Sequence, residues 1–227
     1  MARCRIVSRG ETPFRDRVEA GQVLGRELSE LRGQGALVLG VPRGGVVVAR
    51  EIAGALDAEL DIVLARKLGA PGNPEVAIGA VTEDGQVFLS EARFPWLARA
   101  SAYVESEKER QLAEIARRAA LYRRVRPKVP LAGRLVIVTD DGVATGATLQ
   151  AALWAARQEG PSRLVAALPV GPEDTVARLA EEADEMVCLR TPPQFYAVGQ
   201  FYETFEQTED EELIEILAAE AERTAVP

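Results

Sequence analysis

Short, almost entirely apolar runs alternate along this chain with longer segments of helical periodicity, and this alternation restricts the fold more than any other feature. The apolar runs are 35–41, 60–65, 135–139, 163–170 and 185–189. The segments with helical periodicity are 44–56, 97–124, 146–160 and 173–183. Strands that are apolar on both faces and separated by helices are typical of a parallel sheet covered on both sides. The sequence therefore predicts an α/β fold with a parallel sheet flanked by helices.

Two other segments complete the expected organisation. An acidic-glycine turn separates the short apolar runs 77–81 and 86–89, which predicts a hairpin. The end of the chain is acidic and amphipathic, which predicts a helix over about 209–223. A length of 227 residues suits one domain, and a hydrophobic content of 47% supports a sizeable core. We expect a single domain over residues 1–227.

The composition excludes several classes of chemistry. The chain contains no histidine, so Ser-His and Cys-His catalysis and histidine metal sites are excluded. Cys4 and Cys188 lie far apart and form no CxxC pair, which argues against a zinc cluster or a disulfide scaffold. The net charge of −8 argues against binding to nucleic acid or to an anionic membrane.

The distribution of apolar residues favours a soluble protein. The first 16 residues lack the apolar stretch of a signal peptide. No apolar run approaches the roughly 18 residues that a membrane span requires. We expect a cytoplasmic protein with no membrane partner.

The most informative segment is LVIVTDDGVATGATLQ, residues 135–150. Asp140 and Asp141 follow a buried strand, and the residues after them are small or carry hydroxyl groups. Ligands of open α/β sheets bind at the carboxyl ends of the strands, and the start of a helix offers free amide groups to a phosphate. The turn that would hold it contains Ala144, Thr145, Gly146, Ala147 and Thr148. The two carboxylates can accept hydrogen bonds from a diol or help to hold a metal ion.

Phosphate followed by a diol describes a ribose 5-phosphate. The other common phosphate motifs fit poorly, because Ala147 stands where a P-loop has lysine and no GxGxxG is present. We expect Asp140 and Asp141 to be exposed at the end of the strand and to contribute little to folding.

An apolar run, two acidic residues and a short loop ending in TGxT together resemble the phosphoribosyl-pyrophosphate motif of the type I phosphoribosyltransferases. The order of segments from 36 to 189 also follows the parallel sheet of that family. The resemblance implies that Asp140 and Asp141 face the ribose 2- and 3-hydroxyls, and that residues 144–148 hold the 5-phosphate. It also implies a Mg²⁺ cofactor, held near Asp140 and Asp141 directly, through water or through the ribose hydroxyls.

Two basic segments are candidates for binding pyrophosphate. GVPRGG, residues 40–45, ends the first apolar run, and Arg43 offers a permanent planar charge while Gly44 and Gly45 permit unusual backbone geometry. In the family the loop at this place binds pyrophosphate, commonly through a cis peptide, here between Pro42 and Arg43. The stretch ARKLGAPGNPE, residues 65–75, contains the basic Lys67 and resembles the mobile loop that closes over pyrophosphate in the family.

The aromatic segment TPPQFYAVGQFYETF is the candidate for binding the nitrogenous base. It lies within the hood subdomain that we expect over about 191–206, and Phe195 and Tyr196 could stack on a flat ring. QFYAVG distantly resembles the hood of hypoxanthine-guanine phosphoribosyltransferases, and that match favours Tyr196. Those enzymes carry an acidic residue at the position of Ala144. The ATG of residues 144–146 is more similar to the adenine-specific branch of the family. The sequence therefore does not identify the acceptor base.

The resemblance implies a Mg²⁺-dependent phosphoribosyltransferase acting in nucleotide salvage, with phosphoribosyl pyrophosphate and a nitrogenous base as substrates and Asp140, Asp141, Arg43 and Lys67 as catalytic residues. A homodimer is a further expectation. The alternative is a non-catalytic regulator of the same fold that binds phosphoribosyl pyrophosphate. A sugar-phosphate hydrolase is a third interpretation, in which only Asp140, Asp141 or Glu75 could activate water.

Overall fold

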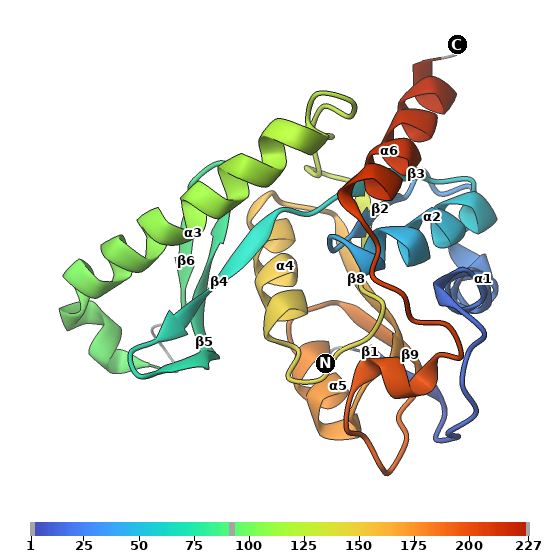
Figure 1. Cartoon of the computed structure of the whole chain (residues 1–227), viewed down its shortest axis with the longest axis horizontal. Helices are drawn as coiled ribbons and strands as arrows, with labels where there is room; N and C mark the ends of the chain where they lie inside the picture. The colour runs from blue at the N-terminus through green and yellow to red at the C-terminus, as the bar shows by residue number, and fades with distance from the viewer. Residues whose placement is uncertain (1–2, 91–93, 226–227) are drawn as a thin grey trace.

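A computed structural model describes residues 3–90 and 94–225 of the chain (Figure 1). Its larger sheet has six strands in the order β1-β9-β8-β7-β2-β3, and every neighbouring pair is parallel. These strands are β1 (Arg3–Ser8), β2 (Leu37–Gly40), β3 (Glu59–Ile62), β7 (Leu135–Thr139), β8 (Arg163–Val170) and β9 (Glu185–Arg190). The predicted parallel sheet is confirmed.

Helices cover both faces of this sheet. They are α1 (Arg17–Glu27), α2 (Gly44–Leu56), α4 (Ala147–Gln158) and α5 (Glu173–Ala180). Alternate residues of β7 serve opposite faces: Ile137 packs in the core shared with α1 and α2, whereas Val136 and Val138 pack in the core shared with α4 and α5. This explains why the strands are apolar throughout.

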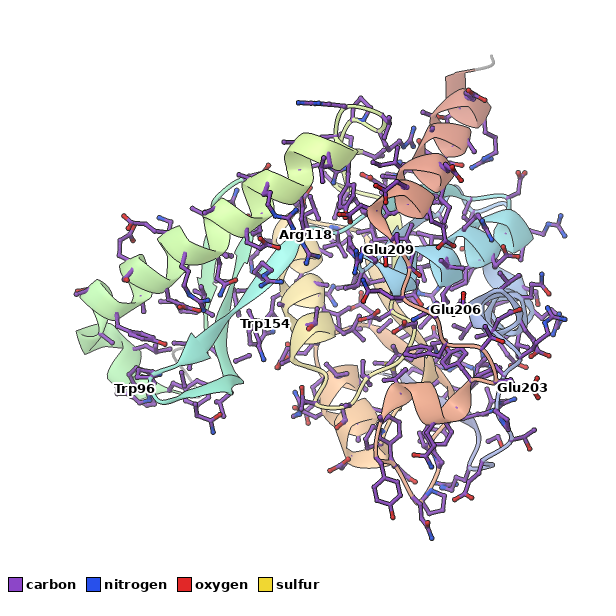
Figure 2. All side chains as sticks on the ribbon, in the orientation of Figure 1. Trp96, Arg118, Trp154, Glu203, Glu206 and Glu209 are labelled. Carbon is purple, nitrogen blue, oxygen red and sulfur yellow. The ribbon has the colours of Figure 1, made fainter. Side chains whose placement is uncertain are left out.

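A second lobe is inserted between β3 and β7 (Figure 1). Strands β4 (Ala65–Ala70), β5 (Asn73–Thr82) and β6 (Val87–Leu89) form an antiparallel sheet, with α3 (Ser101–Tyr122) packed along it. On the α4 side, the ring of Trp154 lies 5.0 Å from that of Phe88 (Figure 2). The small sheet therefore lies between α3 and α4.

This lobe differs from the sequence expectation in one respect. The predicted β5–β6 hairpin is present, whereas residues 65–75, expected to be a mobile loop, instead form β4, a turn and the start of β5. Pairing with β5 supplies β4 with hydrogen bonds that no local pattern reveals. The charged helix predicted over 97–124 is present as α3, preceded by the 3-10 helix η2 (Pro95–Arg99).

Three further segments complete the fold. Another 3-10 helix, η1 (Ser29–Leu31), follows α1. Residues 191–206 contain the 3-10 helix η3 (Val198–Phe201), and Tyr202 bridges to Phe14. Helix α6 (Asp210–Ala225) occupies the place of the predicted C-terminal helix and contacts α2 and β3. None of the described helices is both long and apolar enough to cross a membrane.

Candidate functional site

The carboxylate pair lies directly after β7, at the carboxyl edge of the large sheet. Strands β7 and β2 are neighbours there, and the chain leads outward from them in opposite directions, to β8 and β9 on one side and to β3 on the other. Such a reversal is where open α/β sheets bind ligands. Oδ1 of Asp140 accepts a hydrogen bond from the amide of Asp141 at 2.9 Å.

Asp140 and Asp141 are less exposed than the sequence analysis expected. Asp141 has only 16% of its side chain exposed, and its Oδ2 lies 2.7 Å from Nε of Arg17. Burial and the neighbouring Asp141 raise the pKa of Asp140 well above its usual value. Burial also raises the pKa of Asp141, although Arg17 opposes that shift. The expectation of exposed carboxylates is therefore wrong for Asp141, which forms a largely buried ion pair with Arg17.

Arg17 is a site residue that the sequence analysis missed. It lies at the first position of α1, and its Nη1 donates to the carbonyl of Glu206 at 2.7 Å. Its guanidinium also lies over the ring of Phe205, 3.9 Å from the centroid. Arg17 therefore connects the carboxylate pair to the C-terminal aromatic segment. The D-x-x-E spacing of Asp16 and Glu19, which cap α1, was a usable signal for this helix.

The 144–148 turn opens α4, as predicted. Gly146 is the residue before the helix and has φ +71°, a conformation that favours glycine. Helix α5 supports the turn from behind, because Thr175 donates to the carbonyl of Ala144 at 3.1 Å and Arg178 donates to that of Thr145 at 2.5 Å. The carbonyls are thus held on the α5 side, and the first amides of α4 lack partners within the helix.

The hydroxyl-bearing residues of this turn are accessible. Thr145 and Thr148 are exposed, as is Ala144, whereas Gly146 and Ala147 are buried. The turn therefore offers two hydroxyl groups together with helix-start amides to an anion.

The 43–45 loop lies against the carboxylate pair. A Cβ added to Gly44 would be 2.1 Å from Oδ2 of Asp141, and one added to Gly45 would be 2.8 Å from Cα of Asp140. Only glycine allows this approach. The peptide between Pro42 and Arg43 is cis, as expected.

Arg43 itself points toward carboxylates near the start of α6. Its Nη1 lies 3.3 Å from Oε2 of Glu209 and 3.7 Å from Oδ1 of Asp210. Figure 2 shows Glu209 just before the start of α6. Pyrophosphate would have to compete with these two carboxylates for the guanidinium.

Lys67 lies on β4 and lines a cavity that Thr148 also lines. The fold therefore places Lys67 near the 144–148 turn, although the two segments are far apart in the sequence. Glu75, one possible water-activating base of a hydrolase, has a side chain outside the described part of the structure.

The two candidate base-binding aromatics have different environments. Phe195 is half-buried and stacks on Phe201, with ring centroids 5.2 Å apart. Tyr196 is 82% exposed. The aromatic segment reaches the carboxylate turn through Tyr202, whose hydroxyl donates to the carbonyl of Asp141 at 2.5 Å, and this contact was not foreseen.

The carboxylate pair can supply only part of a metal site. Within the described residues, no group of three or more aspartates, glutamates or cysteines comes together as a metal site. Asp140 forms no ion pair with a described cation, and its raised pKa indicates that a bound cation would stabilise its ionised form. Mg²⁺ commonly binds through one or two carboxylates plus substrate phosphates and water, and Asp140 and Asp141 fit that pattern.

The structure is that of an α/β protein with three features at the carboxyl ends of β2 and β7: a carboxylate pair, a turn that starts a helix and a glycine-containing loop. The phosphoribosyl transferase domain matches residues 20–204 of the chain. The chain therefore belongs to the phosphoribosyl transferase family, and the resemblance seen in the sequence is confirmed.

Relatives at high identity support this membership. Two Mycobacterium tuberculosis proteins, of strains CDC 1551 and H37Rv, are named "Putative phosphoribosyl transferase" and are each 47% identical over 204 residues, 90% of this chain. The match covers 46% of each, so the chain spans about half the length of these curated relatives. The crystal structure of TT1426 from Thermus thermophilus is 48% identical, with a TM-score of 0.86, over 92% of this chain and 99% of that one.

Proposed function

We propose that the protein is a phosphoribosyltransferase that joins a nitrogenous base to the ribose 5-phosphate of phosphoribosyl pyrophosphate and releases pyrophosphate. One observation carries the proposal: the 43–45 loop, the carboxylate pair and the 144–148 turn meet where β2 and β7 lie side by side. Gly44 and Gly45 pack directly against Asp141 and Asp140. A pyrophosphate, a ribose and a 5-phosphate need three such adjacent sites.

In this proposal each part of the donor has its own partners. Amides at the start of α4, with the hydroxyls of Thr145 and Thr148, hold the 5-phosphate, and Ala144, Gly146 and Ala147 contribute only backbone. Asp140 and Asp141 accept hydrogen bonds from the ribose hydroxyls. The 43–45 loop and Arg43 hold the pyrophosphate, and Lys67 approaches it from the second lobe.

The chemistry requires no covalent nucleophile. The lone pair of a ring nitrogen forms a bond to C1 of the ribose while the C1–O bond breaks, and the pyrophosphate leaves with that electron pair. The nitrogen then loses its proton. The protein contributes by positioning both partners and by placing Arg43 and Lys67 beside the charge that develops on the leaving group. Mg²⁺ bound with the donor near Asp140 and Asp141 would add further positive charge for that group.

The acceptor is proposed to bind near the aromatic segment. Tyr196 has a free ring face, and Phe195 is already stacked on Phe201. We therefore assign base stacking to Tyr196, with Phe195 supporting the segment.

A panel of nitrogenous bases incubated with phosphoribosyl pyrophosphate and Mg²⁺ tests the proposal through release of pyrophosphate. At least one base should give base-dependent release, and Asp141→Asn should lower it strongly. Asp84→Asn is the matched control, since it makes the same change in an exposed ion pair with Lys128. Donor binding without release for any base would overturn the transferase proposal and favour the regulator.

A further inference from the structure

The segment between η3 and α6 contacts both Arg17 and Arg43. Residues 203–210, here called the strap, lead from the aromatic segment to the start of α6 (Figure 1). The backbone amides of Glu203 and Thr204 donate to carbonyls just before α1, at 2.8 and 2.9 Å, and so anchor the beginning of the strap. Figure 2 shows three glutamates of the strap, at positions 203, 206 and 209, in succession along it.

The contact of the strap with Arg17 leaves the charge of that arginine unopposed by the strap. The carbonyl of Glu206 accepts a hydrogen bond from Nη1 of Arg17 at 2.7 Å, and the ring of Phe205 lies under the guanidinium. Neither partner carries a negative charge. The charge of Arg17 therefore remains available to Asp141.

The contact of the strap with Arg43 is different, because here the strap supplies carboxylates. Nη1 of Arg43 lies 3.3 Å from Oε2 of Glu209 and 3.7 Å from Oδ1 of Asp210. The other carboxylate oxygen of Glu209 accepts a hydrogen bond from Gln207 at 3.1 Å. A guanidinium binds carboxylate and phosphate oxygens with the same geometry. Glu209 therefore occupies the group that the proposed function assigns to pyrophosphate.

The two carboxylates are held with different firmness. Asp210 accepts a hydrogen bond of 2.5 Å from the hydroxyl of Tyr122 at the end of α3. The side chain of Glu209 is 60% exposed, and its other partner, Gln207, is itself exposed. Exposed ion pairs contribute little net free energy, so Glu209 can be displaced from Arg43 at modest cost while Asp210 stays with Tyr122.

We propose that Glu209 is an internal competitor of pyrophosphate: it occupies Arg43 in the free protein and is displaced when the pyrophosphate end of the donor binds. This inference rests on the proposed transferase function, which assigns Arg43 to pyrophosphate. No covalent bond changes, since the guanidinium only exchanges one anion for another. The competition lowers the affinity for pyrophosphate and thereby favours its release after the transfer.

Titration with inorganic pyrophosphate at a fixed Mg²⁺ concentration measures the competition without requiring turnover. Glu209→Gln should bind pyrophosphate about three-fold more tightly than the wild type, because glutamine offers no charge to Arg43. Glu211→Gln is the matched control, since it removes the same charge from an exposed side chain that forms no ion pair within the described residues. It should leave the affinity within about 1.5-fold of the wild type.

Arg43→Gln completes a double-mutant cycle. Alone it should weaken pyrophosphate binding, and in its presence the gain from Glu209→Gln should disappear, because the two residues then no longer interact. Calorimetry on the wild type, the two single variants and the double variant provides the four affinities.

The other outcomes decide against the competitor. Equal or weaker binding by Glu209→Gln overturns the proposal, and weaker binding would show that Glu209 instead orients Arg43 for the anion. A gain that Glu211→Gln shares, or that persists without Arg43, also overturns it, because general charge repulsion would then be the cause.

Failure of the proposed function gives a different result. If Arg43→Gln leaves pyrophosphate affinity unchanged, Arg43 is not a pyrophosphate ligand and the competitor proposal is overturned with that assignment. Competition that depends on Arg43, without base-dependent release of pyrophosphate in the panel of bases, supports the competitor and overturns the transferase. Base-dependent release without competition does the reverse.

Discussion

Arg17 and Asp141 form an ion pair of 2.7 Å, Nε to Oδ2, although 124 residues separate them in the sequence. Their side chains are only 12% and 16% exposed. The pair joins the first helix to the proposed ribose site and, through the carbonyl of Glu206, to the segment that precedes α6. A residue near the start of the chain thereby orients a carboxylate that the proposed reaction uses.

We expect Asp141→Asn to weaken binding of phosphoribosyl pyrophosphate by about 1–3 kcal/mol, because a charged acceptor of hydrogen bonds is lost. Unfolding free energy should also fall, by about 1–2 kcal/mol, because Arg17 loses its charged partner. Calorimetry and urea unfolding measure the two effects. Asp84→Asn should change neither by more than about 0.5 kcal/mol. Unchanged donor affinity would remove Asp141 from the ribose site.

Sulfate should raise the melting temperature by binding at the 144–148 turn, since a ligand of the folded state stabilises it. Thr145→Val and Thr148→Val should each weaken that binding about five-fold, near 1 kcal/mol for a lost hydrogen bond. Thr204→Val, at another exposed threonine, is the control. A sulfate response equal to that of the wild type in the double variant would place the anion elsewhere.

Gly146 tests the same turn in a different way. Its φ is +71°, and an added Cβ would lie 2.8 Å from Cγ2 of Thr175 and 2.9 Å from Cδ1 of Leu179. Gly146→Ala should therefore destabilise the protein by about 1–3 kcal/mol even without an anion, as thermal unfolding in chloride would show. Gly54→Ala, a position with open space around the added Cβ, should be neutral or stabilising.

Tyr196→Ala should raise the Michaelis constant for the acceptor several-fold, since stacking is worth about 1 kcal/mol, and leave that for the donor nearly unchanged. Its melting temperature should match the wild type, because the side chain is 82% exposed. Phe195→Ala should instead lower the melting temperature, because its ring packs on Phe201. Equal effects of Tyr196→Ala on both substrates would contradict the assignment.

Tyr122 should make stability depend on alkaline pH. Burial and the hydrogen bond of 2.5 Å to Asp210 raise the pKa of Tyr122 to about 12. Between about pH 10, where an unfolded tyrosine ionises, and pH 12, the folded state retains a proton that the unfolded state releases. This contribution is therefore complete below about pH 10 and is lost as the pH rises to about 12, by up to about 2–3 kcal/mol.

Urea unfolding of Tyr122→Phe between pH 8 and pH 11.5 measures this contribution. The variant should lack the extra alkaline loss of stability, whereas Tyr196→Phe, which removes an exposed phenol, should retain it. Parallel pH curves for the wild type and Tyr122→Phe would show that the folded state does not hold this proton.

The local pattern of residues was sufficient to predict the parallel sheet and the turns that contain the motifs. Strands β7 and β8 and the helix α2 have the bounds that their apolar runs and periodicity predicted. The 144–148 turn and the 43–45 loop lie where strand ends followed by small residues placed them. These features could be read because each depends on neighbours in sequence: the period of side chains, the start of a helix and the turn that follows a strand.

Tertiary structure alone decided the contacts between distant segments. The 65–75 stretch looked like a loop because its glycines and prolines oppose regular structure, and pairing of β4 with β5 overrides that tendency. Asp141 looked exposed because its partner, Arg17, lies on a helix 124 residues earlier in the chain. Arg66 of β4 donates to Gln111 of α3, a contact between segments 45 residues apart that no local pattern indicates. Burial and charge pairing arise from the three-dimensional arrangement of the chain, and the order of residues does not express them.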